Sequence, residues 1–359
     1  AGERLGGRLG RLLRLQQRGH ECRKRNEMAN AHRRDRRDRV GVTGWNVGVR
    51  GEAVEEAPGG RDSPTMPLSA IALVLLSALL HASWNLLLKR AGGTQEVVAL
   101  SKIVEVVLFA PVFVWGFAAD LPEAATVAWF TAVAATGVGL NYLFLARAYR
   151  HGELSVVYPI SRGAILAFLP VAGWFALGER VAPLGVAGLL AIVCGILVLN
   201  LPEWSRSAVR GLATSLRGRA TLYSIAAGFV AAGYTVWDKR AVAVMAPFAY
   251  MYLYTVLVAL GYGVWLATRV ASGATRQAWR AHAPSIVGIG AMNTASYLLI
   301  LLALRTGVTS YVLGMRQVSI AVGVWMGWAL LRERMSGPRL AGVVLIVAGC
   351  LAVTLVAGR

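Results

Sequence analysis

Two arginines interrupt long apolar stretches of this chain, and their surroundings are alike. Arg162 lies within YPISRGAILAFLPVAGWF, and Arg316 lies within VLGMRQVSIAVGVWMGW. A charged side chain in hydrocarbon costs at least ~3 kcal/mol on insertion scales, so such residues normally face a polar interior. A guanidinium binds carboxylate, phosphate or phosphonate groups through two parallel hydrogen bonds. The pair indicates either an anion site or a structural network in which each arginine holds helix-end carbonyls or a glutamate.

Four further ionisable residues lie in apolar stretches, where they could carry protons across a membrane. Lys102 and Glu105 stand three residues apart and therefore share one helix face. They form either a structural ion pair or a pair in which Glu105 carries a proton. His81 titrates near neutral pH, and its alternative role is polar packing. Asp238 lies at a position of the second half that matches Asn85 in the first.

Aromatic and amide side chains accompany these charges and complete the candidate site. Trp84-Asn85 and Trp237-Asp238 match each other, and the tryptophans are either binding residues or anchors at the membrane interface. Polar groups in hydrocarbon need hydrogen-bond partners, so they should face inward, where they line a pathway or join helices. The remaining candidates of this kind are Tyr158, Asn293 and Tyr297, with Asn141 and Tyr142 beside them.

The match between the two halves of the chain extends beyond the arginines. At one constant offset, Arg162, Glu179, Gly188 and Gly195 correspond to Arg316, Glu333, Gly342 and Gly349. A duplicated membrane bundle with an intramembrane charge in each copy is typical of transporters that bind their substrate between two repeats. The two glutamates lie in the turns GER and RER, and we expect each to steady a helix start.

Ten apolar runs of helical length carry these residues, since about 20 apolar residues cross a bilayer. The predicted spans are 68–88, 96–117, 126–148, 154–177, 183–201, 221–237, 247–268, 284–304, 309–331 and 338–357. Residues 202–220 form the longest connection, a linker between a first repeat at 66–201 and a second at 221–357. Because five is odd, the second repeat enters the membrane in the opposite sense. The sequence therefore predicts an all-α integral membrane protein with ten transmembrane helices, arranged as two inverted five-helix repeats.

Charge is distributed unevenly along the chain, which carries a net charge of +19. Residues 1–65 are rich in arginine and glycine and predict a disordered basic tail. The later basic residues lie mostly between apolar runs, which favours membrane loops over nucleic acid binding. Connections after odd-numbered spans carry most of them, which places the termini of the ten-span region outside. The basic tail argues the reverse, so both orientations stay open.

Several of these elements together resemble a known family. The strings HASWNLLLKRAG and VYPISRG and the Gly-Glu-Arg turn before the fifth span resemble EamA-type transporters of the drug/metabolite transporter superfamily. The two strings also resemble a subgroup of membrane proteins associated with phosphonate utilisation. The resemblance covers about residues 66–357 and implies a ten-helix inner-membrane protein that moves small metabolites through a central cavity. Tyr158-Pro159 aligns with Leu313-Gly314, a departure from the internal symmetry that predicts a lopsided pocket.

Taken together, these patterns predict a secondary transporter, a permease or an exporter, for a small anionic or zwitterionic metabolite. It would work by alternating access and have a small-molecule substrate and the lipid bilayer as partners. The alternatives are a membrane-embedded enzyme acting on lipid headgroups and a non-transporting scaffold. The sequence contains no HExxH, GxSxG or GxxxxGK[ST] motif and no metal-ligand spacing. We therefore expect no enzymatic activity, no cofactor and no ATP-driven pump.

Overall fold

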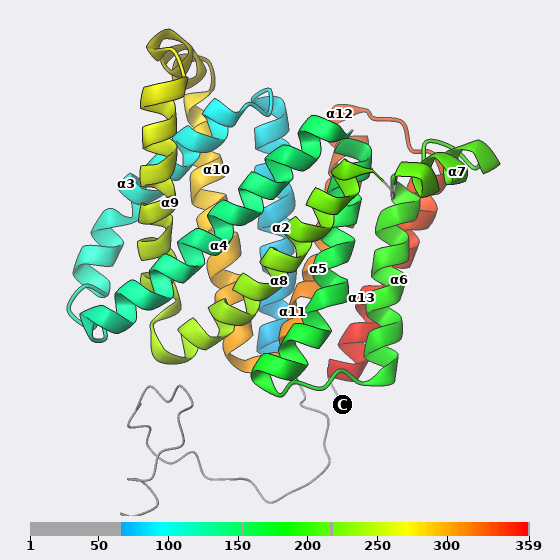
Figure 1. The fold of residues 1–359 in the computed structure, drawn as a ribbon, viewed down its shortest axis with the longest axis horizontal. Helices are drawn as coiled ribbons and strands as arrows, with labels where there is room; N and C mark the ends of the chain where they lie inside the picture. The colour runs from blue at the N-terminus through cyan, green and yellow to red at the C-terminus, as the bar shows by residue number, and fades with distance from the viewer. Residues whose placement is uncertain (1–65, 153, 216–217, 358–359) are drawn as a thin grey trace, which may run out of the picture. The chain divides into compact units, whose positions relative to one another are not determined.

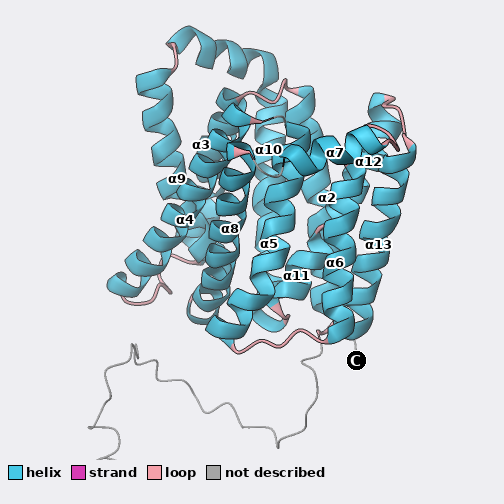
Figure 2. Ribbon diagram, turned by 45° about the vertical axis from the view of Figure 1, so that its right-hand side comes forward, coloured by secondary structure: helices cyan, strands magenta, loops and turns pink. Residues whose placement is uncertain are grey.

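The computed structural model describes residues 66–152, 154–215 and 218–357, and the regular elements in these ranges are helices (Figure 2). Eight described helices are long and apolar enough to cross a membrane, which makes this an all-α membrane protein. They are α2 (Leu68–Arg90), α3 (Gln95–Gly116), α4 (Ala124–His151), α5 (Leu154–Leu177), α8 (Arg219–Val244), α9 (Pro247–Arg269), α10 (Ser272–Thr306) and α13 (Gly337–Ala357). The predicted tail, residues 1–65, lies outside the described residues.

Two of the ten predicted spans differ from the expected long helix. The fifth is α6 (Pro183–Leu199), which is apolar but has only 17 residues. The ninth, at 309–331, is divided into α11 (Thr309–Arg316) and α12 (Val318–Leu331). The ten-span count and the inverted repeat therefore stay predictions, although eight of the ten predicted spans are present as long helices.

The division between α11 and α12 falls at Gln317, directly after Arg316. The backbone N–H of Gln317 donates to the carbonyl of Gly314 at 3.0 Å, a tighter turn than the α-helix makes. Its side-chain amide donates to the carbonyl of Leu313 at 3.0 Å. These two bonds satisfy carbonyls that the interrupted helix would leave open inside the membrane. No proline or glycine stands at the break, so the apolar pattern contained no signal for it.

Two other elements also differ from the sequence prediction. The predicted linker at 202–220 contains a helix, α7 (Arg206–Ser215). Helix α10 begins twelve positions before the predicted start at 284, but its backbone is non-helical at His282, with φ −134° and ψ 16°. Pro284 lacks an N–H and restricts the residue before it, which accounts for a kink here. The predicted start therefore coincides with the kink rather than with the end of the helix.

Small residues hold the long helices together. Helix α2 packs along α10, α4 and α5 pack along α8, and α6 packs along α13. Ser77 of α2 and Ser296 of α10 are both buried, and each hydroxyl donates to the other residue's carbonyl, at 2.7 and 2.9 Å. Reciprocal bonds of this kind satisfy both hydroxyls and join helices in an apolar medium.

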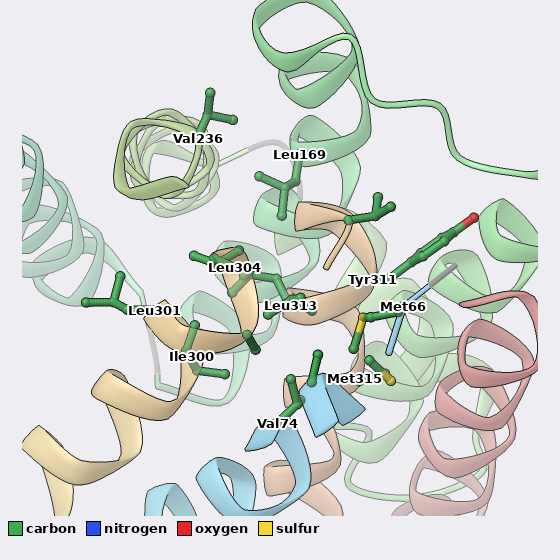
Figure 3. Packing of buried hydrophobic residues seen from close by; sticks show 14 of the residues in the cluster. Met66, Val74, Leu169, Val236, Ile300, Leu301, Leu304, Tyr311, Leu313 and Met315 are labelled. Atoms are coloured by element: carbon green, nitrogen blue, oxygen red, sulfur yellow. The ribbon is translucent and has the colours of Figure 1, made fainter. Parts of the chain in front are cut away.

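Helix α11 lies in the centre of the packed bundle. All residues from Thr309 to Met315 are buried. Figure 3 shows its Tyr311, Leu313 and Met315 among apolar side chains of α2, α5 and α10, such as Val74 and Leu304. A helix enclosed in this way has little freedom to move its end. Arg316, the last residue of α11, is therefore held by the core of the protein.

The contact between α6 and α13 depends on the four glycines that the internal match singles out. A Cβ placed on Gly188 would lie 2.9 Å from the carbonyl oxygen of Gly349, and one on Gly195 would lie 2.8 Å from that of Gly342. Side chains do not pack this closely against backbone atoms. The two backbones therefore approach to a distance that only glycine permits.

We expect Gly188→Val and Gly349→Val each to destabilise the folded protein by about 1–3 kcal/mol, because the added side chain overpacks the contact. Thermal unfolding of the purified protein in detergent measures the effect. Gly261→Val is the matched control, since no atom lies within 4 Å of a Cβ at that helical position. Equal losses in the control and the contact variants would contradict the close approach of α6 and α13.

Candidate functional site

A cavity of about 330 Å³ lies among helices α2–α5 and α8–α11. Its volume is within the range of small-molecule sites. The predicted site residues that line it are His81, Trp84, Lys102, Glu105, Arg162, Asn293, Tyr297 and Arg316. The structure thus brings the two arginines and most of the other candidates, which are far apart in sequence, to one place.

Arg316 enters the cavity from the end of α11 and touches two aromatic rings. Its guanidinium nitrogen lies 3.2 Å from Nδ1 of His81. The guanidinium carbon lies 5.4 Å from the ring centre of Tyr297, an arrangement favourable for a cation–π interaction. The His81 ring in turn stands edge-on to Trp84, with ring centres 5.0 Å apart. The planar guanidinium is therefore oriented by aromatic groups on α2 and α10.

Asp238 lies behind the cavity wall and is connected to it by a tyrosine. The hydroxyl of Tyr297 donates to Oδ2 of Asp238 at 2.5 Å, and the hydroxyl of Tyr250 donates to Oδ1 at 2.6 Å. Asp238 itself is buried. The ring of Tyr297 therefore links the carboxyl group of Asp238 to the guanidinium of Arg316.

Lys102 and Glu105 form the predicted pair on the α3 side of the cavity. Nζ of Lys102 lies 2.8 and 3.1 Å from the two carboxylate oxygens of Glu105. The side-chain amide of Asn293 on α10 donates to the same carboxylate at 3.0 Å. Glu105 is thus held by groups from two helices while it faces the cavity.

Arg162 is placed by the close approach of α5 to α8. A Cβ on Gly228 of α8 would lie 2.8 Å from the carbonyl oxygen of Ser161 and 2.4 Å from Cβ of Ala164. These two residues flank Arg162, whose side chain lines the cavity. The approach of α8 along this part of α5 fixes the backbone that carries the arginine.

Two further candidates, Asn85 and Trp237, lie away from the cavity. Asn85 donates to the carbonyl of His81 and does not line the cavity. Trp237 donates to the carbonyl of Phe130 at 3.0 Å and packs between Trp129 and Phe130, so it joins α8 to α4. The side chain of Tyr158 lies outside the described residues. We therefore leave Asn85 and Trp237 out of the candidate binding surface.

The cavity also contains polar residues that the sequence analysis did not select. They are Ser101, Tyr149, Ser161, Tyr234, Tyr254, Thr255 and Thr294. The rule applied to Asn293, that a polar group in an apolar helix turns inward, would have found the tyrosines of α8 and α9. Asn141 and Tyr142 also line the cavity, but the Asn141 amide donates to the carbonyl of Ala227 at 2.8 Å, so it joins α4 to α8 as well.

The two matched glutamates lie in the α5–α6 and α12–α13 loops, at opposite ends of the bundle (Figure 1). Glu179 accepts hydrogen bonds from Lys239 and from the backbone N–H and hydroxyl of Thr309, both at 2.9 Å. Thr309 is the first residue of α11, where a carboxylate is favourable. Glu179 therefore caps α11, a helix of the other half of the chain, and not the start of α6 that follows it.

Glu333 makes a looser cluster at the opposite end. It pairs with Lys89 at the end of α2, and Arg339 lies 3.5 Å from its second oxygen. The hydrogen bond from Lys89 holds the pKa of Glu333 below its ordinary value. A lowered carboxyl pKa stabilises the fold above the ordinary pKa of glutamate, and this contribution is lost as the pH falls through the lowered value.

Comparisons with known proteins agree with this architecture. Residues 218–355 match the EamA-like transporter family. The match spans α8 to α13 and supports the predicted relation to the drug/metabolite transporter superfamily. A family of transporters also fits the expectation of no enzymatic activity. Together with the eight apolar helices, the match indicates a multi-pass membrane transporter.

The fold itself has a counterpart among solved structures. The crystal structure of another protein superposes with a TM-score of 0.63, covering 81% of this chain and 98% of that chain. The two sequences are 17% identical, so the similarity shows the fold alone. No curated protein matches the chain by sequence.

Proposed function

We propose that this protein is a secondary transporter that binds a small anionic or zwitterionic metabolite between Arg162 and Arg316. The observation that carries the proposal is the shared cavity of these two arginines. Among the described residues that line it, Lys102 and the two arginines carry positive charge and Glu105 carries negative charge. An anionic group would neutralise the surplus, and bidentate pairing would give it a defined orientation.

The other side of the cavity supports a zwitterionic substrate as well as a simple anion. Glu105 faces the cavity beside Lys102 and could accept a hydrogen bond from a substrate ammonium group. A carboxylate or phosphonate would then lie at the arginines. The resemblance to proteins associated with phosphonate utilisation makes aminophosphonates and amino acids the first compounds to test. The resemblance to EamA-type transporters also leads us to propose the inner (plasma) membrane as the location of the protein.

Alternating access is the proposed mechanism, and the two glutamate clusters support it. Side chains in the Glu179–Lys239 pair are 9% and 23% exposed, whereas those of Lys89 and Glu333 are 63% and 31% exposed. We propose that the Glu179 end is closed in this conformation and that transport requires this cluster to open. Movement of one repeat against the other would alternate the two ends.

Coupling to protons is proposed for the acidic residues next to the arginines. Asp238 reaches Arg316 through Tyr297, and Glu105 lies on the opposite wall with Lys102. Protonation of Asp238 would weaken its bond from Tyr297 and loosen the ring on which Arg316 packs. His81, 3.2 Å from the same guanidinium, is the third group of this relay.

The proposal is tested with the full chain in vesicles and a mixed pool of metabolites. We expect mass spectrometry of the vesicle contents to find uptake of compounds with a carboxylate, phosphate or phosphonate group, and no uptake of neutral or purely cationic ones. An imposed pH gradient should stimulate this uptake, and Asp238→Asn should abolish the stimulation. Uptake of cations alone would refute the anion site, and full stimulation in Asp238→Asn would refute the role of that residue.

A further inference from the structure

A second hollow, of about 860 Å³, lies on a different face of α2 from the polar cavity. The α2 residues that line this groove are Ala82, Asn85, Leu86 and Lys89. Those that line the cavity are His81, Trp84 and Leu88. At about 100° per residue, these two sets point in directions about 120° apart. The groove is therefore separate from the candidate binding site.

The groove combines apolar walls with a basic rim. Its walls are formed by Leu86, Leu199, Ile320, Val324 and Leu331, from α2, α6 and α12. Its rim carries Lys89, Arg334 and Arg339, with Glu333 among them. One glutamate is shared by Lys89 and Arg339, so the rim keeps a surplus of positive charge. Walls and rim together match a molecule with an apolar chain and an anionic head.

The residues around the rim of the groove are of the types found at the surface of a bilayer. Trp204, in the connection after α6, is 63% exposed and lies against Gly337 at the start of α13. Tryptophan is enriched at the level of lipid headgroups. The following helix, α7, bears the exposed Arg206 and Arg210, as helices at a membrane surface do.

We infer that this groove binds an anionic phospholipid of the surrounding bilayer. The phosphate would lie between Arg334 and Arg339, where guanidinium groups can pair with it. An acyl chain would run along α12, past Gly323, whose missing side chain leaves open space within 4 Å. Charge complementarity and the apolar walls together favour a lipid over free phosphate, which would use the rim but not the walls.

The test compares lipids with the purified full chain in detergent, by native mass spectrometry and thermal unfolding. We expect phosphatidylglycerol to bind and to raise the unfolding temperature more than phosphatidylcholine or inorganic phosphate does. Arg334→Gln and Arg339→Gln should each weaken phosphatidylglycerol binding about fivefold, the size expected for one basic residue near a lipid headgroup. Equal effects of phosphatidylcholine or of inorganic phosphate would overturn the proposal.

A second variant tests the walls independently of the rim. Gly323→Phe should fill the groove and reduce phosphatidylglycerol binding without preventing folding, because a Cβ at this position meets no atom within 4 Å. The matched controls are Gly261→Phe, in similarly open space, and Arg269→Gln, an exposed arginine at the end of α9. Unchanged binding in Gly323→Phe, or equal losses in the controls, would show that the groove holds no lipid.

Discussion

Methionine in place of Arg162 or Arg316 should reduce uptake of the transported anion by at least about a hundredfold per folded molecule. Each change keeps an unbranched apolar stem but removes the guanidinium and with it two charge-assisted hydrogen bonds, which contribute about 1.5–3 kcal/mol apiece. The effect is measured as initial uptake into vesicles, normalised to the amount of folded protein in the membrane. Arg316 also packs on Tyr297, so its variant should in addition lose some thermal stability.

Controls separate a binding role from a structural one. Arg162→Lys and Arg316→Lys should recover only part of the uptake, because lysine is a point charge without the planar fork of arginine. Arg269→Met, at an exposed position at the end of α9, should transport normally. If both cavity variants show reduced amounts of folded protein but normal uptake per folded molecule, the arginines are structural. The assignment as a membrane transporter would stand in that case.

The physical cost of polar groups in hydrocarbon explains which parts of the site could be predicted. Arg162, Arg316, Glu105 and Asn293 were selected because each needs a polar environment, and each lines the cavity. The same cost applies to any polar residue on a membrane helix, whatever helices pack against it. The cost therefore indicates that these four side chains turn inward before the tertiary structure is known, and their role in binding stays a prediction.

Matching positions between the halves was a weaker guide to the site. Asn85 and Trp237 were selected because Trp84-Asn85 matches Trp237-Asp238. In the structure, however, Asn85 lines the groove and Trp237 packs against Phe130. A match in sequence does not determine which face of a helix meets the cavity, because that depends on the helices packed around it. Glu179 does cap a helix start, but the helix is α11 rather than α6, and its partner Thr309 is too far away in the chain for the sequence to indicate it.

Most of the fold followed from the length and apolar character of the spans, and the exceptions have local causes. The break at Gln317 is stabilised by a side-chain bond to Leu313 that leaves no mark in the hydropathy pattern. Helix α7 is short and bears exposed arginines. A search for long apolar runs therefore assigns this segment to a loop. Short and amphipathic elements of this kind are where a search for transmembrane spans has least information.

Glutamine in place of Glu179 should destabilise the protein by about 2–4 kcal/mol, whereas Glu333→Gln should cost less than about 1 kcal/mol. The two changes are chemically identical, so burial decides the difference. Glu179 is only 9% exposed, and its loss leaves the charge of Lys239 with poor access to water and α11 with a weaker cap. Lys89 is 63% exposed, and exposed ion pairs contribute little. Thermal or denaturant unfolding of both variants in one detergent measures the contrast.

The double variant Glu179→Gln, Lys239→Gln distinguishes a buried charge pair from a general weakening of this end of the bundle. Removing both partners should cost less than removing Glu179 alone, because no unpaired charge then remains in a nearly buried place. Additive losses would instead mean that the two side chains act independently, although they are bonded in the structure. If Glu333→Gln proved as costly as Glu179→Gln, the unequal exposure of the two ends could not be used to identify the closed one. The proposal that the Glu179 end is the closed one depends on this difference in stability, because a closed end should be held by the stronger of the two ion pairs.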